Sequence, residues 1–345
     1  MLKTKSTYKS IDLFSGIGGL TSGMHYAKFE TKVAIELEPN AAKGYKLNFP
    51  DTEVLQEDIR KIDIKEVKKK LENQTLHLIA GCPPCQGFSR VRRLNRKANV
   101  RDERNSLVEE YFKMVKALKP LTIMMENVPG LKDYYLFKKI VKKLKDLGYN
   151  LKYKVVNVKD YGVPQSRERL VMVGSLLGEI DVAPGTGEKV TVREKIEHLP
   201  SPEETDDPLQ RIVARHTKEV MERIKLTPKD GGSWTDLPEE YILACHKKKN
   251  VGFKDVYGRL RWDDYSTTIT GGCLNPSKGR FLHPEQDRVI TPREAALLQS
   301  FPEDYKFPTD LPKASLALLI GNALPPKFSY IQSKNIKEHL DQHLG

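Results

Sequence analysis

Short apolar runs that alternate with helical patterns constrain the fold of this chain more than any other feature. The runs are as short as buried strands, and turns or polar segments separate them. They cover residues 10–14, 31–35, 52–55, 76–80, 121–125, 151–158 and 170–174. Between them, residues 62–71 and 137–147 carry apolar side chains at helical spacing. Strands and helices in alternation predict an α/β fold with a doubly wound parallel sheet.

Composition and charge limit the kinds of protein that the chain can be. The 345 residues suffice for one large domain with a smaller one, and 39% hydrophobic with 30% charged residues excludes a wholly disordered chain. No apolar run is long enough to span a bilayer, and the opening residues lack the apolar core of a signal peptide. Four cysteines without a framework pattern fit a reducing compartment. We therefore expect a cytoplasmic protein, and the formal charge of +12 favours a polyanionic partner.

The chain changes character near residue 179. Beyond this point proline- and glycine-rich segments interrupt every periodic stretch, and between them fall aromatic and basic residues that suit groove contacts with DNA, such as Trp234, Arg259 and Arg261. The predicted divisions are a catalytic and cofactor-binding domain at 1–178, a loop-rich second domain with a hinge at 179–312, and a C-terminal segment at 313–345 that returns to the first domain.

Capping signals mark the starts of two helices. Glu109 follows Ser106 by three residues, which is the capping-box pattern. Thr291 precedes Pro292, and proline is favoured at the first helical position. We predict helices after Ser106 and Thr291, and a last helix from Lys327.

A glycine-rich turn follows the first predicted strand. Residues 15–20 read Ser-Gly-Ile-Gly-Gly-Leu, a tight turn into a helix that is typical of nucleotide sites but is also ordinary structural punctuation. The third glycine of the dinucleotide fingerprint is missing, which favours a cofactor with a nucleoside but no pyrophosphate. Glu36 ends the next strand, where a carboxylate can accept both hydrogen bonds of a ribose diol. Asp58, after the third strand, is either an acceptor for an adenine amine or a carboxylate at a helix N-terminus.

A stiff loop follows the strand at 76–80. It reads Cys-Pro-Pro-Cys-Gln from Cys82, and its two prolines restrict the backbone that presents Cys85. Such stiffness suits a nucleophile, although a buried structural cysteine and a redox pair are alternatives. The spacing of the pair also fits a zinc half-site, but Cys245 and Cys273 stand alone and complete no set of four ligands. We therefore expect no metal.

Polar residues also end the later strands. Glu126 directly follows the apolar strand at 121–125, where a carboxylate is costly unless it has a partner or a function. Alternate residues of an extended segment share one face, so Gln165, Arg167 and Arg169 are predicted to project together toward one anion or base edge. A structural ion pair at Glu126 and a solvated salt-bridge ladder at the arginines are the alternatives.

In order and spacing, these motifs resemble the motif set of cytosine-5 DNA methyltransferases of the bacterial restriction-modification type. The matching segments are Asp12 to Leu20, Glu36, Asp58, Pro83 to Gln86, Glu126 to Val128, Gln165 to Arg169, Arg293-Glu294 and Gly321-Asn322. The resemblance covers almost the whole chain except roughly residues 180–255, where that family has a variable target-recognition region. It implies a Rossmann-like, S-adenosylmethionine-dependent methyltransferase domain plus a smaller, loop-rich target-recognition domain.

The resemblance also implies a catalytic mechanism. A thiolate from Cys85 would add to C6 of cytosine, and the electron density gained at C5 would let that carbon attack a sulfonium methyl group. Glu126, in its protonated form, would hydrogen-bond N3 and the exocyclic amine, while Arg167 and Arg169 would hold O2. The target cytosine would be flipped out of the duplex, with Arg90 to Arg104 as the candidate closing loop.

By the same resemblance the methyl donor is S-adenosylmethionine. The adenine, ribose and methionine parts are assigned to residues of the glycine turn, of the next two strand ends, of the cysteine loop and of the C-terminal segment. These residues are Phe14, Ser15, Gly16, Gly18, Gly19, Leu20, Glu36, Leu37, Asp58, Ile59, Pro84, Leu107, Asn322 and Ala323.

Together, these features predict a monomeric DNA (cytosine-5-)-methyltransferase that acts on a specific short sequence of double-stranded DNA. A restriction endonuclease of the same specificity is the expected companion, without a stable complex. A transfer RNA cytosine-5 methyltransferase shares most of the motifs, and an inactive DNA-binding regulator is the alternative from another class. The long insert at 179–312 favours DNA, because sequence readout in the major groove needs additional surface.

Overall fold

The computed structural model describes residues 8–72, 74–84, 107–247 and 255–345, and the chain divides into two compact units. Unit 1 consists of Met1–Tyr161, Glu168–Thr186 and Leu324–Gly345, and unit 2 of Gly162–Arg167 and Gly187–Ala323. The divisions differ from the predicted ones in three respects. Residues 162–167 group with unit 2, unit 1 extends to Thr186 rather than to residue 178, and the return to unit 1 begins at Leu324 rather than at residue 313.

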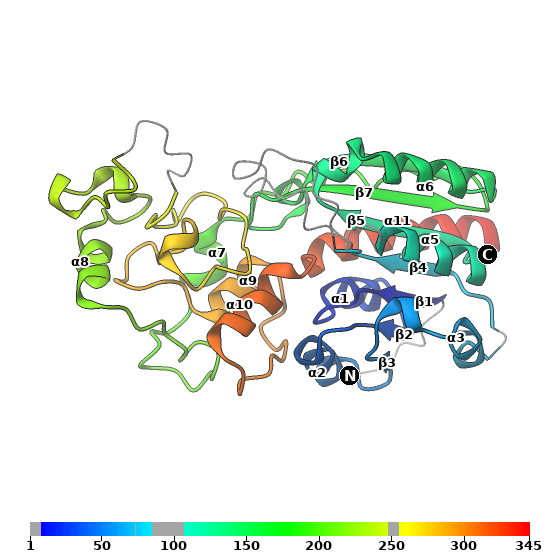
Figure 1. The fold of residues 1–345 in the computed structure, drawn as a ribbon, viewed down its shortest axis with the longest axis horizontal. Coiled ribbons are helices and arrows are strands. Elements are labelled where there is room, and N and C mark those ends of the chain that lie inside the picture. The colour runs from blue at the N-terminus through cyan, green and yellow to red at the C-terminus, as the bar shows by residue number, and fades with distance from the viewer. Residues whose placement is uncertain (1–7, 73, 85–106, 248–254) are drawn as a thin grey trace. The chain divides into compact units, whose positions relative to one another are not determined.

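Unit 1 is built on one mixed seven-stranded sheet (Figure 1). The strands are β1 (Tyr8–Leu13), β2 (Phe29–Ile35), β3 (Glu53–Leu55), β4 (Leu78–Gly81), β5 (Thr122–Asn127), β6 (Asn150–Asn157) and β7 (Glu168–Ser175). Their order is β3-β2-β1-β4-β5-β7-β6, so the chain leaves β1 first toward one edge and later toward the other. All seven predicted strands are confirmed, and the carboxyl ends of β1, β2, β4 and β5 meet at one edge of the sheet.

The prediction of a parallel sheet holds for β1 to β5 and is wrong for the last two strands. β7 runs antiparallel to both β5 and β6. Only a short 3₁₀ turn, Val158–Tyr161, and the segment 162–167 connect β6 to β7, so there is no crossover helix of the kind that a parallel pair requires. The first residues of β7 therefore lie at the same edge as the end of β5, where Asn127 pairs with Leu170.

Helices cover both faces of this sheet (Figure 1). They are α1 (Gly19–Tyr26), α2 (Pro39–Asn48), α3 (Ile64–Lys70), α5 (Leu107–Leu118), α6 (Tyr135–Asp146) and α11 (Pro326–Leu344). Alternate residues of β2 show the two layers, because Val33 packs with the apolar faces of α3, α5 and α6, whereas Ala34 packs with Tyr45 of α2. α11 lies against α1 so closely that a Cβ on Gly23 would come within 2.3 Å of the Tyr330 nitrogen. No helix in the described part of the chain is long and apolar enough to cross a membrane.

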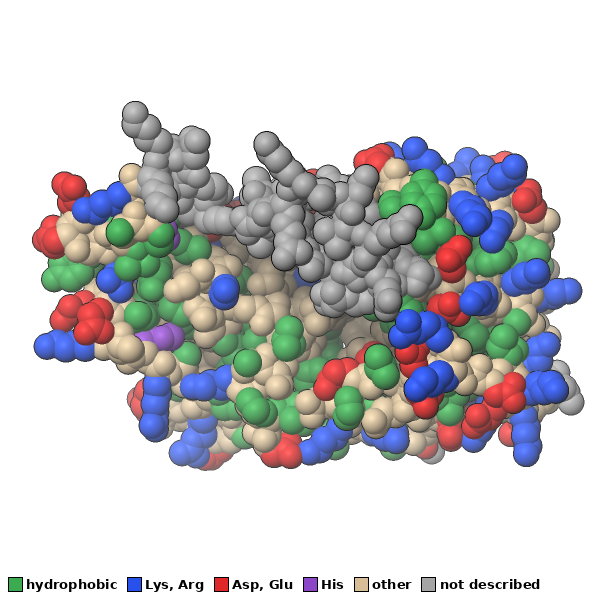
Figure 2. Space-filling model, viewed as in Figure 1, with side chains coloured by type: hydrophobic (Ala, Val, Ile, Leu, Met, Phe, Trp, Pro, Cys, Tyr) green, Lys and Arg blue, Asp and Glu red, His purple; other side chains and the backbone are tan. Residues whose placement is uncertain are grey.

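The lysines of α6 lie on its outer side. Leu136, Phe137, Ile140, Val141 and Leu144 are buried, whereas the lysines between them are mostly exposed. Figure 2 shows basic side chains gathered over this part of unit 1, interspersed with acidic ones. The lysine run is therefore the solvated face of an amphipathic helix.

Unit 2 contains short helices and long connecting segments. The helices are α7 (Val192–Ile196), α8 (Lys218–Leu226), α9 (Pro292–Leu298) and α10 (Lys313–Asn322). The predicted start of α9 is confirmed, because Thr291 caps it in a capping box with Glu294 and Pro292 is the first helical residue. The predicted capping residue of α5, Ser106, lies outside the described residues.

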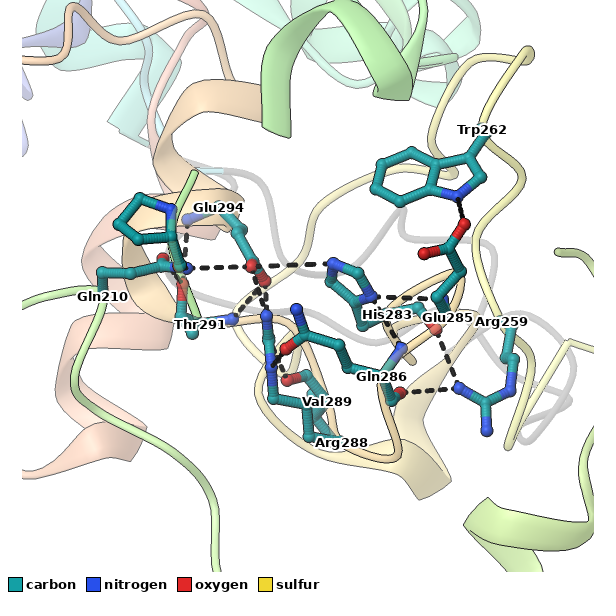
Figure 3. Close-up of polar contacts among 11 residues, drawn as sticks. Gln210, Arg259, Trp262, His283, Glu285, Gln286, Arg288, Val289, Thr291 and Glu294 are labelled. Atoms are coloured by element: carbon teal, nitrogen blue, oxygen red, sulfur yellow. Dashed lines mark hydrogen bonds and ion pairs between the residues drawn. The ribbon is translucent and has the colours of Figure 1, made fainter. Parts of the chain in front are cut away.

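Buried polar side chains stabilise unit 2 where regular structure is sparse. Figure 3 shows Glu294 at the centre of one such network. Arg288 donates to both of its carboxylate oxygens at 2.8 and 2.6 Å, the Thr291 N–H donates at 2.9 Å and the Gln210 amide at 3.1 Å. Burial alone would raise the pKa of Glu294, but the Arg288 guanidinium holds it below its ordinary value. Glu294, singled out in the sequence, is thus an internal anchor of unit 2.

Candidate active site

The glycine turn after β1 has a strained backbone. Phe14, Gly16 and Gly18 have φ angles of 60°, 56° and 96°, in the left-handed region that residues other than glycine rarely adopt. The Ser15 N–H donates to the Ile35 carbonyl at 3.1 Å, so the turn is held at the ends of both β1 and β2. A Cβ at Gly16 would meet nothing within 4 Å among the described residues, which leaves open space beside the turn.

Glu36 joins this turn to the end of β2. The Gly16 N–H donates to Glu36 Oε2 at 2.7 Å, and the Glu38 N–H donates to Oε1 at 2.8 Å. Burial raises the pKa of Glu36 above its ordinary value. Backbone N–H groups thus fix the carboxylate at the turn, and its role in binding a ribose stays a prediction. The neighbouring Leu37 is 60% exposed.

Asp12 is a buried acid at this turn to which the sequence pattern gave no separate role. Thr21 donates to its Oδ2 at 2.6 Å and also contacts the Tyr45 hydroxyl at 2.8 Å. Asp12 Oδ1 is buried and has no hydrogen-bond partner among the described residues. Burial raises the pKa of Asp12 to about 8. In the sequence, only the position of Asp12 in a predicted strand with apolar neighbours pointed to its burial.

The raised pKa of Asp12 predicts a pH-dependent stability. An unperturbed aspartate has a pKa of 3.8 and folded Asp12 one of about 8, so folding takes up a proton and stability falls as pH rises between these values. Asp12→Asn, which is neutral throughout, should therefore raise the melting temperature more at about pH 8 than at about pH 5. Thermal unfolding at both pH values measures this, with exposed Asp51→Asn as the control. Equal shifts at the two pH values would contradict the expectation.

Asp58 begins a short 3₁₀ turn, Ile59–Lys61, after β3. The Arg60 N–H donates to its Oδ1 at 3.0 Å, and the Arg60 guanidinium donates to both oxygens. These hydrogen bonds lower the pKa of Asp58 to about 2. Ile59 is buried beside it, so the turn is anchored to the core of unit 1.

The loop after β4 is tied to both neighbouring strands. The Cys82 N–H donates to the Leu13 carbonyl at 3.2 Å, and the Asn127 amide donates to the Pro83 carbonyl at 2.8 Å. Pro84 and Leu107 flank the segment 85–106 and are half-buried. Cys85 and the candidate closing loop Arg90 to Arg104 lie outside the described residues.

Cys82 differs from a reactive cysteine. Its thiol hydrogen-bonds the Glu126 carboxylate, and burial together with the charges of Glu126 and Asp12 raises its pKa well above the ordinary value. Iodoacetamide at neutral pH is therefore expected to leave Cys82 unmodified in the folded protein while it alkylates exposed Cys245. Peptide mass mapping measures both sites. Alkylation of Cys82 at the rate of Cys245 would contradict this account.

Glu126 and Arg169 form a buried ion pair at the same sheet edge. Arg169 Nε lies 2.6 Å from Glu126 Oε1, and the two side chains are 13% and 9% exposed. The antiparallel pairing of β5 with β7 brings them together, since Glu126 pairs with Val171. Burial lowers the pKa of Arg169, an effect that the Glu126 carboxylate opposes. This ion pair is the structural alternative that the sequence left open at Glu126, and contact of the two side chains with a cytosine ring stays a prediction.

Gln165 and Arg167 are buried, precede β7 and belong to unit 2, whereas Arg169 belongs to unit 1. The Gln165 amide donates to Gln299 at 2.7 Å, and Arg167 donates to backbone carbonyls at 2.9 and 3.1 Å. Projection of Gln165, Arg167 and Arg169 toward one anion or base edge stays a prediction. A catalytic role for Arg167 stays a prediction.

Asn322 and Ala323 lie in unit 2. Asn322 is the last residue of α10 and is exposed, whereas Ala323 is buried and follows the helix. Gln299, buried in the same unit, donates to the Ile320 carbonyl at 2.7 Å and so fixes the end of α10. The assignment of Asn322 and Ala323 to the methyl donor stays a prediction.

Comparison with known proteins agrees with this geometry. The model of one family, described as C-5 cytosine-specific DNA methylase, matches residues 8–338. The chain belongs to this methylase family. C-5 cytosine methylases of this family transfer a methyl group to DNA from S-adenosylmethionine, so the predicted family, enzyme class and methyl donor are confirmed.

Relatives of this methylase match it over nearly its whole length. It is 35% identical to the Type II methylase M.HgiDII of Herpetosiphon aurantiacus over 343 residues, which cover 96% of this chain and 95% of the relative. It is 34% identical to the Type II methyltransferase M1.HphI of Haemophilus parahaemolyticus, with coverages of 92% and 83%.

Solved structures show the same fold for this methylase. A crystal structure of a candidate DNA modification methyltransferase encoded within an Escherichia coli prophage matches with a TM-score of 0.74 and 26% identity, over 97% of this chain and 100% of that one. A crystal structure of a Spodoptera frugiperda DNMT2 variant matches with a TM-score of 0.67 and 18% identity, over 96% and 100%. The predicted Rossmann-like methyltransferase fold is thereby confirmed.

Proposed function

We propose that this DNA cytosine-5 methyltransferase modifies one short sequence in duplex DNA as the modification enzyme of a Type II restriction-modification system. The observation that carries the proposal is the match to M.HgiDII, which spans 95% of that Type II methylase. A companion endonuclease would recognise the same sequence without forming a stable complex with the methylase. The enzyme would act as a monomer in the cytoplasm.

The residues at the ends of β1 and β2 fit the methyl donor. Asp12 Oδ1 and Ser15 Oγ are buried polar atoms that have no partner among the described residues, and Gly16 faces open space. Glu36 would accept hydrogen bonds from the ribose, and Asp58 one from the adenine amine. When bound, S-adenosylmethionine supplies a methyl group activated by its sulfonium.

The catalytic residues would act on the cytosine ring. The Cys85 thiolate would form a bond to C6, and the electron pair displaced toward C5 would make that carbon nucleophilic. Glu126 would hydrogen-bond N3 and the exocyclic amine, while Arg169 would hold Glu126 and O2. Loss of the C5 proton after methyl transfer would return an electron pair to the ring and expel Cys85.

Unit 2 is the proposed target-recognition unit. Its long connecting segments between α7 and α9 carry the aromatic and basic side chains that direct base readout requires. Its interior is fixed by Arg259 and Glu294, so its surface segments are held on a rigid frame.

Bisulfite sequencing tests the proposed function. Purified enzyme with S-adenosylmethionine should convert one cytosine of a single short sequence in unmethylated phage DNA into 5-methylcytosine. Transfer RNA in a parallel reaction should receive no label from the methyl-labelled donor. Label in transfer RNA but not in duplex DNA would overturn the proposal, as would methylation at cytosines without a common sequence.

A further inference from the structure

The side chain of Arg60 forms an ion pair with Asp58. Its Nε lies 3.0 Å from each carboxylate oxygen, and its terminal nitrogen lies 2.5 Å from Oδ2. The Arg60 N–H adds a hydrogen bond to Oδ1 at 3.0 Å. One residue therefore contacts the carboxylate through both its backbone and its side chain.

Asp58 can accept one more donor if the shared Arg60 Nε hydrogen bonds a single oxygen. An ionised carboxylate has about four acceptor positions, and Arg60 uses all of them with two contacts on each oxygen, of which the Nε hydrogen makes two. The Asp58 side chain is 14% exposed, so a ligand can reach it. When the Nε hydrogen bonds one oxygen, the other oxygen can accept an N–H of an exocyclic amine while the backbone N–H and the terminal nitrogen of Arg60 keep their contacts.

Arg60 also restricts how Asp58 can move. The guanidinium is planar and contacts both carboxylate oxygens, which favours one orientation of the carboxylate plane. Asp58 is ionised at every working pH, because its pKa lies at about 2. The carboxylate thus remains a fixed, charged acceptor before any ligand arrives, which lowers the cost of ordering it on binding.

We infer that Arg60 is a positioning residue for the methyl donor, which holds Asp58 in the orientation that accepts the adenine amine. The inference rests on the proposed role of Asp58 in binding adenine. Arg60 is itself 49% exposed and needs no contact with the donor for this role.

Binding and kinetics of Arg60 variants test the inference. Calorimetry with S-adenosylhomocysteine should show a dissociation constant about two- to fivefold higher for Arg60→Ala, the size expected of a half-exposed ion pair. The KM for S-adenosylmethionine should rise by the same factor, with kcat on phage DNA unchanged. Arg60→Lys keeps the positive charge but not the planar pair of N–H donors, so its dissociation constant should lie between those of wild type and Arg60→Ala. Lys61→Ala removes an exposed charge that pairs with Glu57 and should leave both constants unchanged.

An Asp58 variant separates this inference from the proposed site. Asp58→Ala should weaken binding by itself, and Arg60→Ala should have no further effect in that background. The inference would be overturned if Arg60→Ala bound S-adenosylhomocysteine as tightly as wild type, or more tightly, while Asp58→Ala bound it weakly. That result would leave the adenine site at Asp58 intact. Wild-type binding by Asp58→Ala would overturn the placement of adenine at Asp58 itself.

Discussion

Glu126→Gln is expected to lower the rate of methyl transfer by about a hundredfold or more. The substitution keeps the size of the side chain but removes the carboxyl group that would share a proton with the cytosine ring. It also removes the negative charge that lies 2.6 Å from the Arg169 guanidinium, whose side chain is 13% exposed. Single-turnover transfer of labelled methyl groups to duplex DNA measures the effect.

The control for Glu126→Gln makes the same chemical change elsewhere in unit 1. Glu109 lies in α5, where it pairs with Lys139 at 3.9 Å, and Glu109→Gln should retain wild-type activity. The melting temperature of each variant shows whether it is folded. If the folded Glu126→Gln enzyme transferred methyl groups at a rate within about threefold of wild type, Glu126 would have no catalytic role.

Arg259→Leu is expected to unfold unit 2. Arg259 has no exposed surface, and its guanidinium donates to Asp287 at 2.6 Å and to four backbone carbonyls at 2.7 to 3.0 Å. Leucine would remove the donor from the buried carbonyls of Thr227, His283 and Ile224, at a cost of about 1–3 kcal/mol each, which together is comparable to the stability of a small domain. Asp287 keeps Lys229 as a partner, and the Gln286 carbonyl keeps the Arg288 N–H. Limited proteolysis should show cleavage within 187–323 while unit 1 survives.

Arg261→Leu provides the matched control for Arg259→Leu. Arg261 lies two residues further along and its side chain is 60% exposed, so its removal should leave the protease pattern of unit 2 unchanged. Arg259→Leu with the melting temperature and protease pattern of wild type would show that the hydrogen bonds of Arg259 do not hold unit 2 together.

The sequence predicts unit 1 well because its signals are local. A buried strand needs only a short apolar run, and each of the seven runs became a strand of the sheet. The direction of β7 was not predictable in this way, since it depends on the absence of a crossover helix after β6. That direction pairs Arg169 with Glu126.

The buried hydrogen bonds inside unit 2 could not be predicted from the sequence. Arg259 stands among aromatic and basic residues, a pattern that favours groove contacts with DNA, yet its side chain is completely buried and the prediction is wrong for this residue. Its partners are backbone carbonyls of residues 24 to 35 positions away, and no residue pattern specifies such partners. Asp12 and Arg60 were missed for a related reason, because their significance depends on which polar atoms the fold brings within reach.

A duplex that carries 5-fluorocytosine at the methylated position tests the central claim most directly. Fluorine at C5 cannot leave as a proton does, so the covalent bond between the enzyme and C6 should persist after methyl transfer. We expect an adduct that survives denaturation, maps to Cys85, requires S-adenosylmethionine and is absent with Cys85→Ala. Methyl transfer to the ordinary duplex without any adduct on the fluorinated one would contradict the account.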